Sequence, residues 1–425
     1  RAMVGNELGF FADCRRYGDV VSFYLGPVPC YVFYDPAVIE EVLLTRADLF
    51  IKDASTRILS EVLGNGLLVS EGDFWRRQRK LAAPPLRRRQ IANYAEQMVA
   101  FAVSHRECAE HEAPVDLHHA MMQLTLEIVV KTLFDLDFGG DGQRVTQAIG
   151  TAIEQLQSSN RAYLRSMLGG VIPMSQPFQA ARAQLRQSVD ELIARRRDNL
   201  GDDLLSRLIA ARDENGQPMA IEQVRDEAVT MFSAGHETTA LALTFAWVLL
   251  AQHPQVLAQM CEELDRVLGE NPPGFDTLGQ LEFTEAVVLE TLRLYPPAWA
   301  IGREPIEDCE LAGYRIPKGA QLYFSQMHTQ RDPRWFPEPE RFNPARWLGG
   351  LEQRLPRFAY FPFGGGARVC IGNHFARMET ILVLATLAQK LTYKPINIEN
   401  LELRGRVTLR PSGPVMATIH HRTRP

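Results

Sequence analysis

One stretch of this sequence decides how the rest is interpreted: Phe363-Gly364-Gly365-Gly366-Ala367-Arg368-Val369-Cys370-Ile371-Gly372. Its consecutive glycines allow a tight backbone that can approach a flat ligand closely. Cys370 follows at the start of a predicted helix, where unpaired backbone N–H groups favour a thiolate over a thiol. Arg368 can neutralise a carboxylate on the edge of such a ligand. The alternative is a glycine-rich loop around a buried, inert cysteine, which a shorter string would favour.

The composition is that of a globular protein with a large core. Of 425 residues, 46% are hydrophobic and 23% are charged, and the formal net charge of -5 gives no global field that points to nucleic acid. The six cysteines form no CxxC pair and are too sparse for a disulfide scaffold, which favours a cytoplasmic location. The longest nearly apolar run, Thr239 to Ala251, is shorter than the roughly 20 residues of a bilayer span, so we expect no membrane segment in this chain. The chain starts at Arg1 rather than Met, so an upstream segment stays open.

Helical periodicity dominates from about Pro36 to Leu294. Ile221 to Gln252 contains no proline and becomes almost wholly apolar, which predicts a helix of roughly 45 to 50 Å through the middle of the molecule. Two further helices are predicted from Thr284 to Tyr295 and from Gly372 to Leu391.

The predicted strands are short and separated by turn sequences. Val20 to Leu25 and Cys30 to Phe33 flank one turn, Tyr314 to Ile316 and Gln321 to Phe324 flank Pro317-Lys318-Gly319, and strand-like runs surround Pro411-Ser412-Gly413. A long proline-punctuated segment follows from Arg331 to Pro362, which is unusual inside a compact domain. The expected fold class is therefore mainly α with small β-sheets.

Three other motifs carry chemistry. Glu290 and Arg293 lie at i and i+3 on one helix face and can pair, although a surface ion pair is the usual outcome. Ala234-Gly235-His236-Glu237-Thr238-Thr239 places poor helix formers inside the long helix, where stability does not require them. The alternative is a threonine bonded to its own helix beside a solvated glutamate. Trp75 and Arg79 share a helix face, which on its own indicates a basic surface helix.

Together the four motifs resemble, in order, those of the cytochrome P-450 family. The resemblance implies a single-domain P-450 fold over residues 1–425, in which haem b (iron protoporphyrin IX) lies between the long central helix on the distal side and the helix after the cysteine loop on the proximal side. It implies that Cys370 is the axial metal ligand. The implied cofactor-binding residues are Trp75, Arg79, Ala234, Gly235, Arg303, Phe363, Gly364, Arg368, Cys370, Ile371 and Gly372.

The resemblance also assigns catalytic, structural and substrate-binding roles. Glu237 would relay protons and Thr238 would hydrogen-bond dioxygen. Glu290 and Arg293 would join Arg341, from Pro339-Glu340-Arg341-Phe342, to fix the proline-rich segment beneath the haem. Substrate-pocket candidates are Met231, Phe232, Ala298, Trp299, Ala300, Ile301, Val415 and Met416.

The implied function is a monooxygenase that inserts one atom of dioxygen into a lipophilic small molecule by C–H hydroxylation or epoxidation. No flavin or iron–sulfur motif is apparent, so NAD(P)H would act only indirectly, through redox partners. A basic patch predicts docking of an acidic ferredoxin or flavodoxin with its reductase, and the alternative is a solvated helix. We expect a monomer. The patch comprises Arg76, Arg77, Arg79, Lys80, Arg87, Arg88 and Arg89.

Two rival functions remain at this level. A haem-thiolate peroxygenase or isomerase would not need the Glu237-Thr238 pair, which argues for oxygen activation. A non-catalytic haem sensor would often carry an output domain, and the sequence shows none.

Overall fold

The computed structural model describes residues 5–112, 114–135, 148, 150–152, 174–396 and 398–422. The chain divides into two compact units. The larger unit comprises Arg1–Phe50, Ala92–Thr125 and Glu237–Pro425, and the smaller unit comprises Ile51–Ile91 and Leu126–His236. The prediction of a single domain stays a prediction.

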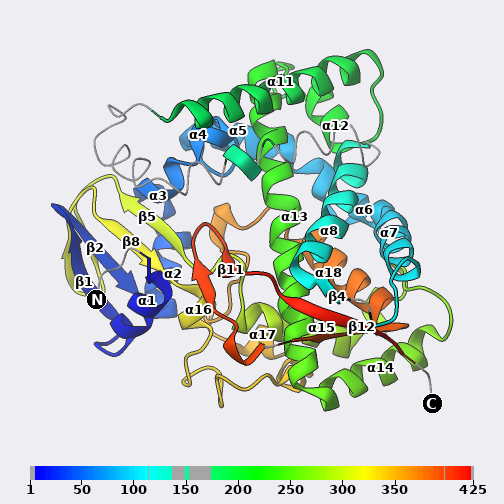
Figure 1. Ribbon diagram of the computed structural model, residues 1–425. Coiled ribbons are helices and arrows are strands. Elements are labelled where there is room, and N and C mark those ends of the chain that lie inside the picture. The colour runs from blue at the N-terminus through cyan, green and yellow to red at the C-terminus, as the bar shows by residue number, and fades with distance from the viewer. Residues whose placement is uncertain are drawn as a thin grey trace. The chain divides into compact units, whose positions relative to one another are not determined.

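The helices carry most of the described chain (Figure 1). Those of the larger unit are α1 (Glu7–Arg15), α2 (Pro36–Glu40), α7 (Ala95–Glu107), α14 (Pro254–Leu268), α15 (Glu282–Leu294), α16 (Gln326–Thr329), α17 (Leu351–Arg354) and α18 (Asn373–Ala388). Those of the smaller unit are α3 (Ala54–Arg57), α4 (Ser60–Leu63), α5 (Gly72–Ala82), α6 (Arg88–Ile91), α11 (Gln176–Asp198) and α12 (Leu204–Ala210). Two helices contain residues of both units, α8 (Leu117–Phe134) and α13 (Ile221–Gln252).

Short single-turn and irregular helices connect these elements. They are η1 (Glu41–Thr45), η2 (Ala47–Leu49), η3 (Pro84–Leu86), η4 (Ala92–Tyr94), η5 (Leu278–Gln280), η6 (Pro344–Trp347), η7 (Gly366–Arg368) and η8 (Ile398–Asn400).

The long helix α13 has the predicted bounds. It ends before His253, and Pro254 then opens α14 at the first helical position, where its missing N–H costs nothing. The ring of His253 bonds the carbonyl of Leu249 at 2.8 Å and so occupies a backbone acceptor at the helix end. α15 starts two residues before its predicted start.

The strands form small sheets. They are β1 (Val20–Leu25), β2 (Val28–Phe33), β3 (Phe50–Lys52), β4 (Pro114–Asp116), β5 (Ile301–Pro305), β6 (Cys309–Leu311), β7 (Tyr314–Ile316), β8 (Gln321–Phe324), β9 (Leu391–Pro395), β10 (Leu403–Gly405), β11 (Leu409–Pro411) and β12 (Met416–His421). In one sheet β1, β2, β8 and β5 are neighbours in this order, with β2 and β8 parallel. In another, β12 lies between β4 and β9.

The strands around Pro317-Lys318-Gly319 have the predicted bounds but do not pair with each other. β7 turns back on β6 through Ala312 and Gly313, whose positive φ angles of 52° and 77° make a tight turn. β8 instead pairs with β2 and β5. The turn sequence therefore marks a change of sheet.

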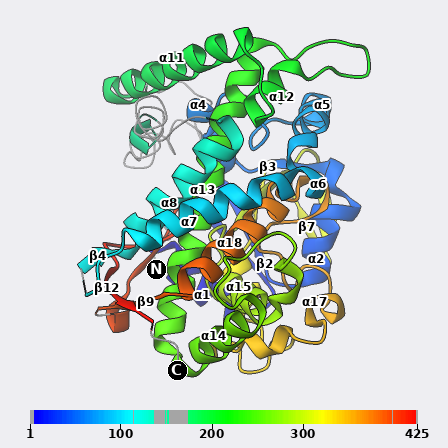
Figure 2. The same ribbon diagram turned by 90° about the vertical axis from the view of Figure 1, so that its right-hand side faces the viewer.

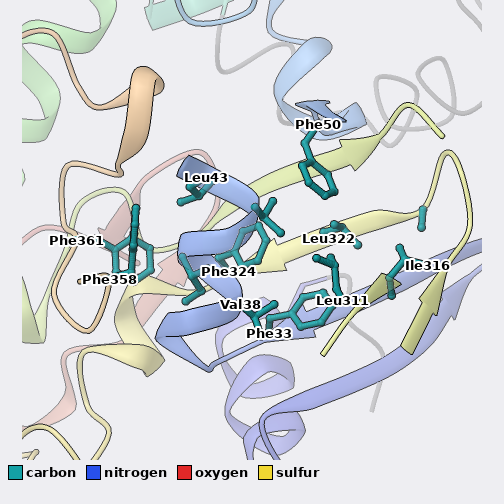
Figure 3. Packing of buried hydrophobic residues seen from close by; sticks show 13 residues of the cluster. Phe33, Val38, Leu43, Phe50, Leu311, Ile316, Leu322, Phe324, Phe358 and Phe361 are labelled. Carbon is teal, nitrogen blue, oxygen red and sulfur yellow. The ribbon is translucent and has the colours of Figure 1, made fainter. Parts of the chain in front are cut away.

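A hydrophobic cluster beneath the first sheet supports the cysteine loop (Figure 3). Phe33, Leu322 and Phe324 come from the strands, and Phe358 and Phe361 lie at one side of the cluster, on the segment that leads to Phe363. On another side of the larger unit, α18 packs on α7 and α15 (Figure 2).

Among the described residues, none of the helices alone is long and apolar enough to cross a membrane. The pair α13 and α14 meets that criterion only jointly, and it is bent by 112° at the break between them.

Candidate functional site

The loop before Cys370 is closed by its own backbone. The N–H of Cys370 donates to the carbonyl of Phe363 at 2.9 Å, and Gly364 and Gly366 adopt positive φ angles of 70° and 63°. These angles are strained for residues with a side chain, which explains the two glycines. α18 begins at Asn373 with Gly372 as its N-cap, close to the predicted start at Gly372, so Cys370 lies in the loop just before the helix.

The same loop lies directly on the core of the larger unit. A Cβ on Gly366 would lie 1.9 Å from the carbonyl oxygen of Leu43, and a Cβ on Gly365 would lie 2.1 Å from the ring of Phe358. The backbone of Leu43 and the ring of Phe358 belong to the core and cannot easily move aside. Gly365 and Gly366 therefore allow the loop to lie close to these groups, and this contact fixes the position of the loop.

The loop presents its thiol outward. Cys370 is exposed, whereas Cys14, Cys30 and Cys261 are buried. Burial raises the pKa of the Cys30 thiol to about 11, which makes that group inert as a nucleophile or ligand at neutral pH. Of these four thiols, Cys370 is the one that a metal can reach.

The larger unit also supplies two cations of the predicted haem site. Arg303 lies on β5 with only 6% of its surface exposed, and its Nη1 donates to the carbonyl of Gly302 at 2.7 Å. Arg368 is half-buried on η7, two residues before the thiol. An accessible thiol, a loop without side chains at the glycines and two arginines together fit a haem with its thiolate ligand and its propionates.

Glu290 is the centre of a buried polar cage. Arg293 donates to its two oxygens at 2.8 and 2.9 Å, Arg346 donates at 3.0 Å, Trp347 Nε1 at 2.8 Å and the backbone N–H of Asn343 at 3.0 Å. The side chains of Glu290 and Arg293 are both 0% exposed. Buried charges persist when every lone pair finds a donor, and here each carboxylate oxygen has at least two.

The cage holds the proline-rich segment. Arg293 also donates to the main-chain carbonyls of Gln330 at 3.0 Å, Pro339 at 2.7 Å and Arg341 at 3.2 Å. The guanidinium thereby fixes three points of a segment that has little regular structure of its own.

Arg341 is not the third member of the cage. Its side chain is 63% exposed and pairs with the exposed Glu338 at 3.1 Å, and only its carbonyl reaches Arg293. The third charge is Arg346. The sequence offered a signal, because two Pro-x-Arg-aromatic strings lie five residues apart, and only the second ends in tryptophan, whose N–H can donate to a carboxylate.

Glu237 on α13 is held by the C-terminal segment. Its Oε1 pairs with Arg410 Nη2 at 2.5 Å and accepts a hydrogen bond from Thr408 Oγ1 at 2.5 Å, and Arg410 Nε donates to the same hydroxyl at 2.8 Å. The glutamate is therefore oriented rather than merely solvated. Thr238 beside it is half-buried.

The small residues before Glu237 have a packing role. A Cβ on Gly235 would lie 3.3 Å from Val129 on α8, so a larger residue would press the two helices apart. Ala234 is exposed. Packing explains Gly235 without any requirement for space at a ligand.

Trp75 and Arg79 lie on α5 of the smaller unit. Trp75 is buried and Arg79 is half-buried. Their predicted contact with a haem propionate stays a prediction.

Parts of the basic patch are neutralised within the smaller unit. Arg77 donates to Asp213 at 2.7 Å and to the carbonyl of Pro218 at 3.0 Å, whereas Arg76 and Lys80 are 53% and 75% exposed and pair with exposed acids. Arg87 is exposed, and the side chains of Arg88 and Arg89 lie outside the described residues.

The predicted pocket residues do not share one environment. Trp299 packs against Phe11 with ring centroids 5.4 Å apart and donates to the carbonyl of Arg406 at 2.9 Å, so it belongs to the core. Phe232 packs against Phe134 at 5.3 Å. Met231 and Val415 are buried, Ala298, Ala300 and Ile301 are half-buried, and Met416 is 39% exposed.

Two buried acids had no motif in the sequence. Burial raises the pKa of Glu379 on α18 well above its usual value, and a hydrogen bond from Thr239 opposes the shift. Burial raises the pKa of Glu227 on α13 to about 7, and its hydrogen bond with Leu67 opposes the shift. Only the tertiary structure identifies such groups, because burial depends on distant segments.

The chain is similar to known proteins in sequence and in structure. The family model described as cytochrome P-450 matches residues 9–417. A cyclooctat-9-en-7-ol 5-monooxygenase of Streptomyces melanosporofaciens is 34% identical over 93% of this chain and 87% of its own length. A pentalenene oxygenase of Streptomyces avermitilis is 33% identical over 99% of this chain and 92% of its own length. The crystal structure of the cytochrome P450DA heme domain superimposes with a TM-score of 0.87 at 27% identity, covering 98% of this chain and 93% of that one.

Proposed function

The chain belongs to the cytochrome P-450 family and is an oxidoreductase of the haem-thiolate type, and from that premise we propose that it inserts one oxygen atom from dioxygen into a lipophilic small molecule. The proposal includes C–H hydroxylation or epoxidation as the reaction. It also includes a cytoplasmic location, a monomeric state and a single domain.

The observation that carries the proposal is the exposed thiol of Cys370 at the end of its glycine loop. We propose that the thiolate of Cys370 would hold the haem iron, with Phe363, Gly364, Ile371 and Gly372 forming the loop around it. Arg303 and Arg368, with Trp75 and Arg79, are the proposed partners of the haem propionates. A bound haem would supply the redox-active iron at which dioxygen is reduced.

The test is the ferrous–carbon monoxide spectrum of the purified protein. Wild type and the exposed-cysteine control Cys108→Ser should show the spectrum of thiolate ligation, and Cys370→Ser should lose it. An unchanged spectrum in Cys370→Ser would remove the proposed ligand and the function with it.

Glu237 and Thr238 are the proposed catalytic pair that handles protons. Arg410 and Thr408 fix the Glu237 carboxylate, so it can orient a hydrogen-bonded chain toward Thr238. We expect Thr238→Val to divert reducing equivalents from product into peroxide. Thr244→Val on the same helix removes a hydroxyl that donates to the carbonyl of Ala240 at 2.7 Å and lies 3.4 Å from His118 Nδ1 on α8, and the variant should keep wild-type coupling.

The substrate class is proposed from the relatives. The two named above are an oxygenase of pentalenene and a monooxygenase of cyclooctat-9-en-7-ol, so we infer a compound rich in hydrocarbon for this chain too. A panel of such compounds, scored by the shift of the haem spectrum on binding, identifies the substrate. Binding confined to ionic compounds would contradict the proposal.

Electrons are proposed to come from NAD(P)H through a reductase and an acidic ferredoxin or flavodoxin. Because Arg77 is tied to Asp213, the exposed Arg76 and Lys80 are the better probes of docking. Arg76→Glu with Lys80→Glu should slow reduction by the partner, while the exposed Arg315→Glu serves as the control. Equal reduction rates in all three proteins would place docking elsewhere.

A further inference from the structure

A glycine-rich loop in the smaller unit is held on α13 by two neighbouring carboxylates. We call residues Gly64 to Leu67, between α4 and α5, the latch loop. The N–H of Asn65 donates to Asp226 Oδ2 at 2.7 Å, and the N–H of Leu67 donates to Glu227 Oε2 at 3.0 Å. Two backbone hydrogen bonds therefore depend on two acidic side chains.

The glycines bring the latch loop into direct contact with the helix. A Cβ on Gly64 would lie 2.0 Å from Asp226 Oδ1, and a Cβ on Gly66 would lie 2.1 Å from Thr230 Oγ1 and 2.7 Å from the carbonyl of Asp226. Gly64 also has a positive φ angle of 63°. This arrangement leaves no room for side chains at Gly64 and Gly66, so the backbone of the latch loop lies directly against α13.

Among the described residues, Glu227 has fewer hydrogen-bond donors than its two carboxylate oxygens can accept. It is 0% exposed, and its Oε1 has no partner among the residues that the structure describes. Thr230 Oγ1, one turn further along α13, is likewise buried and has no partner within the described chain. A buried carboxylate with one neutral donor is costly when ionised.

Among the residues that the structure describes, no cation acts on the pKa of Glu227. The charge that acts on it is Asp226, of the same sign. The pKa of Asp226 is in turn affected by the charges of Arg225 and Glu222 on α13 and of Arg186 on α11. Arg225 is ion-paired with Asp190 on α11, and Arg182 on α11 is ion-paired with Glu61 on α4. The latch loop itself contains no titratable side chain.

We propose that Glu227 is a proton-operated latch: its neutral form holds the latch loop closed on α13, and its ionised form releases the loop to solvent.

The expected size follows from linkage. The pKa of Glu227 is raised from 4.5 to about 7 by burial in the closed position, and it returns to the lower value when the loop opens and water reaches the carboxylate. The closed state therefore binds the proton more tightly, so opening becomes more favourable as the pH rises. Between pH 6 and pH 8 the opening equilibrium should increase by about tenfold.

Hydrogen exchange of the two loop amides in the holoenzyme measures this directly. After correction for the intrinsic exchange rate, the protection of the Leu67 and Asn65 amides should fall by about tenfold between pH 6 and pH 8. Protection that stays constant over this range in the wild-type chain would overturn the proposal, and this measurement needs no variant.

Two variants sharpen the result. In Glu227→Gln the amide oxygen can still accept from Leu67, so protection should persist and lose its pH dependence. Glu222→Gln removes an exposed charge from the same helix without removing a loop contact, and it should behave as wild type. A tenfold fall that survives in Glu227→Gln would assign the titration to another group.

Discussion

Glu290 and Glu227 are both fully buried glutamates, yet their surroundings differ completely. Among the described residues, two arginines, a tryptophan and a backbone N–H give Glu290 five hydrogen bonds, whereas Glu227 receives one, from the N–H of Leu67. Burial removes water from both. What replaces the water decides how well the ionised form of each group is stabilised.

The difference teaches how the same side chain serves two purposes. A saturated carboxylate ties together chain segments that have little structure of their own, as Arg293 and Glu290 do for the residues around Pro339. An unsaturated one stays sensitive to protons, because its ionised form is poorly stabilised. Substitutions at Glu290 and at Glu227 test the two sides of this comparison.

The largest effect is expected from Glu290→Gln. The substitution leaves Arg293 and Arg346 buried beside a neutral group, which should lower the free energy of unfolding by about 3 to 5 kcal/mol. Denaturant titration followed by circular dichroism measures the loss. Glu338→Gln, at the exposed pair with Arg341, is the matched control and should cost less than about 1 kcal/mol. Equal losses would mean that saturation is not what stabilises the cage.

A second substitution pair tests which arginine completes the cage. Arg346→Ala should destabilise the protein by about 3 kcal/mol, since it removes a charged hydrogen bond from a buried carboxylate. Arg341→Ala should change the free energy of unfolding by less than about 1 kcal/mol, because its side chain is exposed. The reverse order would restore Arg341 as the third member.

Because Glu227 titrates near neutral pH, we expect the free energy of unfolding to depend on pH. The folded-state pKa of Glu227 is raised to about 7, so the contribution of this group is complete below its unfolded pKa of 4.5 and is lost as the pH rises through 7. The loss should be at most about 3 kcal/mol. It is measured as the difference between wild type and Glu227→Gln, because other groups titrate in both. A difference that is independent of pH from 4.5 to 8 would contradict this assignment.

The smallest expected effect concerns the surface on which the latch loop rests. Gly66→Ala forces a methyl group against Thr230 and the backbone of Asp226, and should lower the free energy of unfolding by about 1 to 3 kcal/mol. Gly279→Ala meets no atom within 4 Å at an ordinary φ and should be neutral. Thermal unfolding of the two variants compares them, and an unaffected Gly66→Ala would show that the loop does not rest on the helix.

Local sequence patterns predicted the bounds of helices and strands better than they predicted which strands pair. The bounds of α13 follow from a proline-free run that ends at Pro254, and those of β7 and β8 follow from the turn between them. The pairing of β8 with β2 could not be predicted, because the two strands are far apart in the chain and neither sequence contains a feature that specifies its partner strand.

The site divides in the same way. Cys370 and the pair Glu290 and Arg293 are recognisable because their motifs are contiguous or one helical turn apart. In the sequence only the tryptophan after Arg346 distinguishes it from Arg341, and the fold of the proline-rich segment is needed to show that both Arg346 and Trp347 reach Glu290. Glu227 and the Glu237–Arg410 pair have no local signature, since their character comes from segments that meet only in the folded chain.

The central strand β12 has a consequence for synthesis on the ribosome. β4 pairs with it in a register that joins Asp116 to Met416, so β4 emerges long before its neighbour is made. At ordinary elongation rates the delay is roughly 15 to 60 seconds. During that time the nascent chain carries an incomplete sheet, and a chain that terminates before Met416 would leave β4 and β9 with no strand to join them. A stop codon just before the codon of Met416 should therefore yield aggregates and chaperone substrates rather than a truncated but folded enzyme.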